Sequence, residues 1–228
     1  MGETPTWYPR SFMGRMSSKA QQALLSLGHT SFLGRDEVLI RQGDPGGVAY
    51  LLLDGQVNIT TLVENGAQSL LAIRHPGDLI GEMAVVAGEP RVATVTGRVR
   101  STLLALPGQG FIRFLGDHPS AALALTIVTG DRLMQSQAYR TDAAAYPVEV
   151  RVARALLYQG QRLAEQDEGV FCLDLKQSEL AMLIGAKEGT VQKALAQGPQ
   201  LKTLVKNRRG QVVILDLPGL TRLADLGG

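Results

Sequence analysis

The chain has 228 residues, 45% of them hydrophobic, and a formal net charge of +2. This length suits one large domain or two modest ones with a buried core, and we expect two. No apolar run approaches the roughly 18 residues of a membrane span and the first residues lack a signal segment, so we predict a cytoplasmic, soluble protein without a membrane partner. The single cysteine, Cys172, excludes an intrachain disulfide and multi-cysteine iron–sulfur or zinc clusters within one chain.

Positive charge is concentrated toward the C-terminus. Residues 176–211 hold seven basic and two acidic residues, whereas residues 1–140 hold twelve and eleven. A short basic segment of this kind is typical of a nucleic-acid contact, although a solvated basic surface would give the same counts.

The N-terminal region is predicted to be a tail followed by a helix. Residues 1–16 are rich in Pro, Gly, Ser and Thr without clear periodicity, which predicts a tail rather than a part of the core. A short helix follows from Ser17 to Leu27, with Ser17 or Ser18 as its N-cap and Gly28 at its end.

Short β segments separated by turns fill residues 29–106. Asp54-Gly55, Asn65-Gly66 and Pro76-Gly77 are typical turn sequences between such segments. The segments lie at residues 38–40, 48–53, 56–62, 68–73, 92–95 and 102–106. Evenly spaced short strands predict a compact antiparallel sandwich or roll.

Residues 119–145 are predicted to form a long dimerisation helix, because no proline follows Pro119 before Tyr146-Pro147. The helix carries residues at alternating spacings of four and three, the pattern of a short coiled-coil seam: Leu123, Ile127, Gly130, Met134 and Gln137. A helix packed on its own β domain fits this spacing equally well. Tyr146-Pro147 offers a hinge, and a helical apolar period resumes from Val150 to Leu163.

The stretch from Gly81 to Val95 combines Glu82 and Arg91 with glycines, Pro90 and apolar residues. An arginine fork can pair with two phosphate oxygens, and successive backbone N–H groups in a tight turn can add donors. A carboxylate about ten residues away can accept from a ribose hydroxyl. The stretch resembles the phosphate-binding cassette of cyclic-nucleotide-binding domains, whose pattern is G-E-(L/M)-A-x-x-x-G-x-P-R-x-A-x-V.

The resemblance implies that Arg91 holds a cyclic phosphate and that Glu82 accepts from the ribose 2′-hydroxyl, with backbone N–H groups near Gly81 and Val92 assisting. Two further residues, Met83 and Ala84, complete the candidate ligand site within the cassette. A surface ion pair between Glu82 and Arg91 is the structural alternative. Val92 stands where some relatives carry a hydroxyl that helps to hold guanine, so the resemblance favours cAMP over cGMP or a cyclic dinucleotide as effector.

The resemblance continues toward the C-terminus. Residues Val150 to Leu157 look like the segment that opens the DNA-binding domain of the CRP/FNR family, the catabolite-activator-like transcription regulators. Counting back from it, Ser136 and Gln137 occupy the positions from which the dimer helix of such regulators contacts adenine. Solvent-facing polar residues are the alternative interpretation for both.

Leu175 to Leu195 is similar to the helix-turn-helix of the family, with Gly185 in the turn where a positive φ is needed. Its small core would consist of four apolar residues, Leu180, Leu183, Val191 and Leu195. Lys206 to Gly210 resembles a wing hairpin with a basic tip. The resemblance implies DNA contacts from the recognition helix and the wing, by Lys187, Glu188, Thr190, Gln192, Lys193, Lys206, Arg208 and Arg209.

The start of the recognition helix departs from the family pattern. Many relatives carry Ser or Thr, Arg and Glu where this chain has Lys187, Glu188 and Gly189. A capping hydroxyl and a guanine-reading arginine are therefore absent, and a glycine weakens the first turn. Gly198-Pro199 also ends the helix early. These departures favour DNA binding through phosphates or with another sequence preference.

Together these patterns predict an α+β protein with a tail (1–16), a cyclic-nucleotide-binding antiparallel β-roll (17–118), a dimerisation helix (119–145) and a winged helix-turn-helix domain (146–228). The expected function is a cAMP-gated homodimeric transcription regulator, with double-stranded DNA, a second copy and RNA polymerase as candidate partners. The alternative is a cyclic-nucleotide-sensing interaction protein whose helix-turn-helix no longer reads DNA specifically. An enzyme is not expected, because no catalytic or metal-binding set of residues clusters along the sequence.

Overall fold

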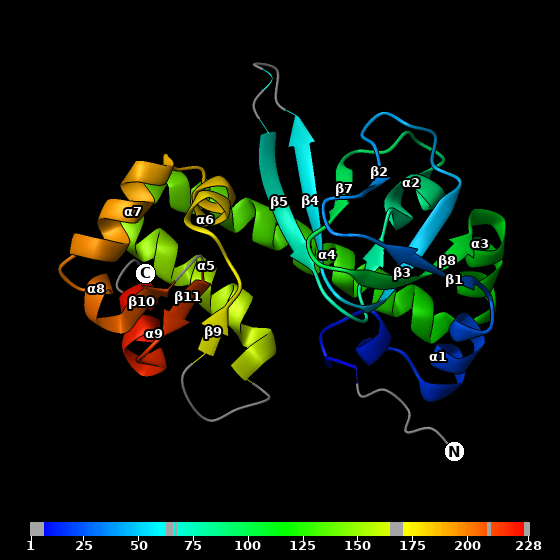
Figure 1. The fold of residues 1–228 in the computed structure, drawn as a ribbon. Helices are drawn as coiled ribbons and strands as arrows, with labels where there is room; N and C mark the ends of the chain where they lie inside the picture. The colour runs from blue at the N-terminus through cyan, green and yellow to red at the C-terminus, as the bar shows by residue number, and fades with distance from the viewer. Residues whose placement is uncertain (1–6, 63–65, 67, 165–170, 209–210, 226–228) are drawn as a thin grey trace. The chain divides into compact units, whose positions relative to one another are not determined.

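The structure is a computed structural model that describes residues 7–62, 66, 68–164, 171–208 and 211–225 (Figure 1). The chain divides into two compact units, Met1–Leu133 and Met134–Gly228, and the boundary falls within one long helix. The predicted α+β class with antiparallel sheets is confirmed in both units. Among the described helices, none has the length and apolar character that crossing a membrane requires.

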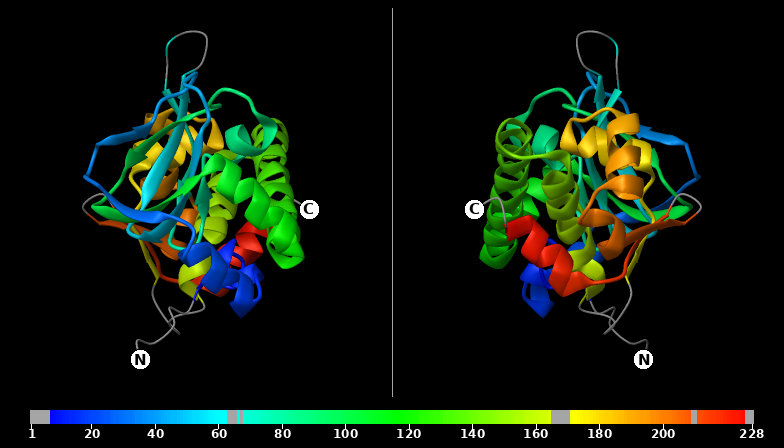
Figure 2. Two further views of the ribbon diagram at one scale, coloured as in Figure 1. Left: turned by 90° about the vertical axis from the view of Figure 1, so that its right-hand side faces the viewer. Right: turned by 90° about the vertical axis from the view of Figure 1, so that its left-hand side faces the viewer.

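The first unit contains two four-stranded antiparallel sheets, ordered β1-β8-β3-β6 and β2-β7-β4-β5. Strands β4 and β5 run side by side as a long hairpin in every view (Figures 1 and 2). The strands are β1 (His29–Leu33), β2 (Val38–Ile40), β3 (Val48–Asp54), β4 (Val57–Leu62), β5 (Gln68–Arg74), β6 (Leu79–Ile80), β7 (Thr94–Gly97) and β8 (Ser101–Pro107). The helices are η1 (Met13–Arg15), α1 (Ser18–Leu25), α2 (Glu82–Ala87), α3 (Gly108–Asp117) and the first part of α4 (Pro119–Ala145).

The apolar alternation of the strands separates two core clusters. In β3, Leu51 belongs to the cluster beneath the helices, whereas its neighbour Leu52 belongs to the cluster between the sheets. Leu104 and Leu103 of β8 divide in the same way, because successive side chains of a strand point to opposite faces. The β-roll is therefore fixed from both sides of its central strands.

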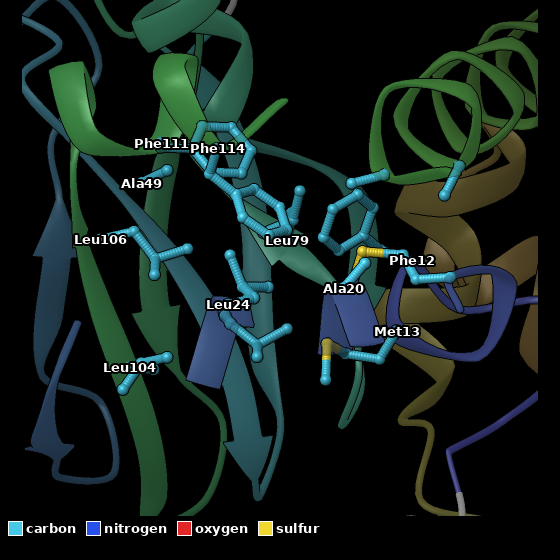
Figure 3. Packing of buried hydrophobic residues seen from close by; sticks show 14 of the residues in the cluster. Phe12, Met13, Ala20, Leu24, Ala49, Leu79, Leu104, Leu106, Phe111 and Phe114 are labelled. Carbon is cyan, nitrogen blue, oxygen red and sulfur yellow. The ribbon is translucent and has the colours of Figure 1, made fainter. Parts of the chain in front are cut away.

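The N-terminal segment is part of this core, so the predicted tail is wrong for residues 7–16. Phe12 and Met13 are fully buried in the cluster that also holds Phe111 and Phe114 (Figure 3). The backbone N–H of Met13 donates to the carbonyl of Gly77 at 3.1 Å. The segment forms turns and a single short 3-10 helix, and such irregular backbone gives its apolar residues no period to detect.

The second unit contains the helix-turn-helix and wing that the sequence predicts. It holds the rest of α4, α5 (Val148–Ala164), β9 (Phe171–Leu173), α6 (Gln177–Ile184), α7 (Glu188–Gln197), α8 (Leu201–Leu204), β10 (Val205–Arg208), β11 (Gln211–Ile214) and α9 (Leu217–Asp225). Helices α6 and α7 are joined through Gly185 at φ +63° and are seen in the right-hand view of Figure 2. The four predicted core residues of the motif are buried. Strands β10, β11 and β9 pair as an antiparallel sheet.

Candidate functional site

The cassette folds around helix α2, which lies between two left-handed glycines. Gly81 precedes the helix at φ +71° and Gly88 follows it at φ +70°. A Cβ added at Gly81 would lie 2.6 Å from Nη1 of Arg91. Glycine is therefore required at position 81 both by the backbone conformation and by the close approach of the arginine.

Arg91 is buried, with 7% of its surface exposed, and among the described residues its guanidinium contacts only neutral acceptors. Nη1 donates to the carbonyl of Gly81 at 2.7 Å, and Nη2 donates to the carbonyl of Val48 at 2.6 Å. The backbone of Arg91 is held by the 43–44 loop, since its N–H donates to Asp44 and its carbonyl accepts from Gly43. None of the described carboxylates forms an ion pair with it.

Glu82 is also buried, and it pairs with an arginine that the sequence analysis missed. Nη1 of Arg132, on α4, lies 2.6 Å from Oε1 of Glu82, and Nη2 of the same residue donates to the carbonyl of Leu79 at 3.0 Å. The surface ion pair between Glu82 and Arg91, weighed as the alternative, is thus not formed. Arg132 precedes Ser136 by one helical turn, a same-face spacing that could have identified it.

The buried charges of the cassette suit a monoanion. The guanidinium of Arg91 and the carboxylate of Glu82 are buried and the guanidinium of Arg132 is partly buried, so these three charges sum to +1, whereas Glu89 of the same stretch is exposed. An ionised carboxylate offers about four acceptor positions, so Glu82 can accept from a hydroxyl while it is paired with Arg132. Arg91 would hold a phosphodiester and Glu82 a ribose hydroxyl, and a cyclic nucleotide bears one of each.

The other predicted ligand residues differ in exposure. Ala84 is buried, and its Cβ would lie 2.6 Å from a Cβ added at Gly46. Met83 is about half exposed, and Val92 is 63% exposed and has no polar atom in its side chain. Ser136 and Gln137 lie on the part of α4 that belongs to the second unit, where both are exposed.

Helix α4 presents a buried and an exposed apolar stripe. One face carries Ala121, Ala124 and Val128, all buried in the core of the first unit. The seam residues Leu123 and Met134 are 61% and 68% exposed, and the exposed stripe also includes Ile127 and Leu133. The helix therefore packs on its own β-roll, as one sequence interpretation predicts, and leaves the seam residues exposed; pairing along the seam stays a prediction.

In the second unit, α7 presents the predicted DNA-contacting residues to solvent. Lys187 is its N-cap but makes no side-chain capping hydrogen bond, as the missing hydroxyl predicts. A Cβ added at Gly189 would meet no atom within 4 Å. Exposed residues on α7, its cap and the wing include Lys187, Glu188, Thr190, Gln192, Lys193, Lys206 and Arg208, whereas Arg209 lies outside the described residues.

Tyr139, near the hinge, is a titratable group outside the cassette with a shifted pKa. Burial raises the pKa of Tyr139, on α4, to about 12, although Gln135 donates a hydrogen bond to its hydroxyl at 3.1 Å. The phenol therefore stays neutral across the physiological range. It contributes packing and hydrogen bonding rather than charge.

Comparisons with known proteins match both units. A cyclic nucleotide-binding domain profile matches residues 31–118, and a Crp-like helix-turn-helix domain profile matches residues 150–223. The CRP-like cAMP-activated global transcriptional regulator of Mycobacterium tuberculosis is 29% identical over 188 residues, covering 82% of this chain and 80% of that protein.

Solved structures share the fold. A CRP/FNR-family transcriptional regulator from Thermus thermophilus is similar with a TM-score of 0.68 at 25% identity, covering 88% of this chain and 100% of its own. The c-di-GMP-responsive global regulator CLP of Xanthomonas campestris is similar with a TM-score of 0.72 at 20% identity, covering 87% and 99%. These relatives are regulators, and the effectors named for the Mycobacterium and Xanthomonas proteins differ.

Proposed function

The chain belongs to the CRP/FNR family of transcription regulators and is a cyclic-nucleotide-binding member, and from this premise we propose that it is a homodimeric DNA-binding regulator whose effector is cAMP. The observation that carries the effector is Arg91, a buried cation whose guanidinium has only backbone carbonyls as partners in the part of the chain that the structure describes. Burying a charge without a counter-charge is costly. A phosphodiester beside Arg91 would supply that counter-charge.

The proposal of cAMP, as opposed to another cyclic nucleotide, rests on two features. Val92 offers no hydroxyl to a guanine base, and a cyclic dinucleotide would bring two phosphodiesters to a cassette with one unpaired arginine. Ser136 and Gln137 are proposed to contact adenine. Calorimetry with cAMP, cGMP and c-di-GMP tests this, and we expect cAMP to bind most tightly. Tightest binding of c-di-GMP would overturn the effector, and no heat with any of the three would overturn the ligand site.

The proposed homodimer forms along the exposed stripe of α4. Large exposed apolar side chains in a row are typical of an interaction surface, and a two-fold axis would pair the stripe with itself. Arg132 lies on the same helix and pairs with Glu82, so ligand binding and seam geometry would be linked. Light scattering at micromolar concentration should give twice the monomer mass. A monomer with and without cAMP would contradict this mechanism.

The proposed DNA binding is dominated by phosphate contacts. Five basic residues per protomer, hence ten in a dimer, are candidates for the duplex: Lys187, Lys193, Lys206, Arg208 and Arg209. If about six engage, log affinity should fall against log salt with a slope near −5. The carboxylate of Glu188 repels DNA phosphates but can accept a hydrogen bond from the N4 amino group of cytosine.

A fluorescence-anisotropy salt titration on palindromic and random duplexes with saturating cAMP tests the DNA proposal. We expect binding to both duplexes with a modest preference for the palindrome. If neither binds at about 50 mM salt, DNA binding fails, and the interaction-protein alternative would be the better interpretation of the second unit.

A further inference from the structure

The turn that precedes recognition helix α7 is held by an arginine from α5. Arg151 is 9% exposed, and its Nη2 donates to the carbonyls of Ile184 and Gly185, the latter at 3.2 Å. These two residues form the C-terminal end of α6, where carbonyls lack helical partners and favour a cation. Arg151 thereby fixes the turn that leads into α7.

The loop that follows α7 is held by a carboxylate from the same turn of α5. Oε2 of Glu149 accepts from the backbone N–H groups of Gln200 at 3.3 Å and Leu201 at 3.1 Å. A Cβ added at Gly198 would lie 2.6 Å from this oxygen, so glycine leaves the room that the carboxylate occupies. The early end of α7 at Gly198 therefore has a structural reason.

We propose that Glu149 and Arg151 are positioning residues that set the orientation of α7 for contact with DNA, an inference that rests on the DNA binding proposed above. Glu149 and Arg151 are two residues apart, which is a rotation of roughly 200° around the helix axis, so their side chains leave opposite sides of α5. One reaches the loop after α7 and the other reaches the turn before it. Lys187 provides no side-chain cap at the start of α7, so the two contacts from α5 hold the segments on either side of the helix.

Arg154, one turn further along α5, provides a matched control. Its Nη1 lies 2.6 Å from Oδ1 of Asp142 on α4, and its Nε donates to the carbonyl of Ala224 in α9 at 2.9 Å. Its guanidinium also lies over the ring of Tyr146, 4.2 Å from the centroid. Arg154 is an arginine on the same helix as Arg151, but its contacts lie at the hinge and at α9.

The first measurement is amide hydrogen exchange on the full chain with three substitutions. Arg151→Leu should speed exchange at Gly185 and Ala186, and Glu149→Leu should speed exchange at Gln200 and Leu201. Arg154→Leu should leave both sites unchanged. Because no DNA is needed, this arm tests the support of α7 even if the proposed function fails.

The second measurement is the affinity ratio for palindromic over random duplex at fixed salt. A variant whose domain is merely less stable loses affinity for both duplexes alike. A variant whose α7 is tilted loses affinity mainly for the palindromic duplex. We expect Arg151→Leu and Glu149→Leu to lower the ratio roughly fivefold, the equivalent of one mismatched base pair, with the salt slope unchanged. If the wild type binds neither duplex, the proposed function fails and exchange alone decides the inference.

Conservative variants keep the test decisive if a leucine variant does not fold. Arg151→Lys retains the charge and one donor, and Glu149→Gln retains an acceptor oxygen, so both should give intermediate exchange rates and ratios. Unchanged exchange at both ends of α7 in the folded variants would overturn the inference. If the wild type binds DNA, variants with the same affinity ratio as the wild type would overturn it as well.

Discussion

Two buried arginines, one in each unit, have nearly the same immediate surroundings but different expected roles. Arg91 and Arg151 are 7% and 9% exposed, and each donates to two backbone carbonyls. The carbonyls at Arg151 end helix α6, where the helix dipole offsets the cation. Those at Arg91 belong to Gly81, before α2, and to the first residue of β3, so no helix end offsets its charge. Burial alone therefore does not distinguish the two arginines, and the ligand site proposed at Arg91 rests on burial without electrostatic compensation.

The largest expected effect is on nucleotide binding through Arg91. Arg91→Leu should weaken cAMP binding by about a hundredfold, because removing one partner of a buried charge-assisted contact costs on the order of 2–5 kcal/mol. Calorimetry measures this directly. Arg113→Leu removes the same charge from an exposed position on α3 and should bind cAMP like the wild type. Equal affinities for the two variants would refute the role of Arg91.

The converse effect is expected on stability through Arg151. Without nucleotide, Arg151→Leu should lower the unfolding free energy by about 1–3 kcal/mol, because two buried carbonyls lose their donor. Arg91→Leu should cost less, since it also relieves an uncompensated buried cation. Urea unfolding followed by circular dichroism compares the two. A greater loss for Arg91→Leu in nucleotide-free protein would show that the comparison is wrong.

Substitution of the two glycines that flank α2 distinguishes an effect of backbone strain on stability from an effect on ligand binding. Gly81→Ala and Gly88→Ala each place a Cβ at nearly the same positive φ, which costs about 1–2 kcal/mol of stability. At Gly81 the Cβ would also displace Arg91, whereas at Gly88 it would meet no atom within 4 Å. We expect both variants to melt earlier and only Gly81→Ala to lose cAMP affinity. Equal cAMP affinity in the two variants would mean that Arg91 is not held in place by Gly81.

The smallest effect is expected at the wing. Arg208→Ala removes two cations from a dimer and should flatten the salt slope by up to about 1.8, with random and palindromic duplexes affected alike. Lys19→Ala, at an exposed position of α1, serves as the charge-matched control and should leave the slope unchanged. An anisotropy titration gives both slopes. A loss confined to the palindrome would assign Arg208 to base reading.

Local signals predicted the elements whose cause is local. The strand at 38–40 and the long helix at 119–145 have the predicted bounds, and Gly55 takes the positive φ that its Asp-Gly turn requires. Helix α2 was missed within a stretch expected between strands, because six residues between two glycines give no helical period. The partners Arg132 and Glu149 were also missed. Each makes a contact some 50 residues away. The spacing of Arg132 to Ser136 could have pointed to Arg132, whereas no local pattern points to Glu149.

The burial of Phe12 and Met13 has a consequence for how the chain folds during synthesis. These residues share a core cluster with Ala121, Ala124 and Val128, which emerge about a hundred residues later. At typical translation rates this delay is about 5 to 20 seconds. Until α4 leaves the ribosome, the part of this core that α4 covers stays exposed to solvent or to chaperones. A fragment of the β-roll that stops before α4 should lack part of its core and aggregate.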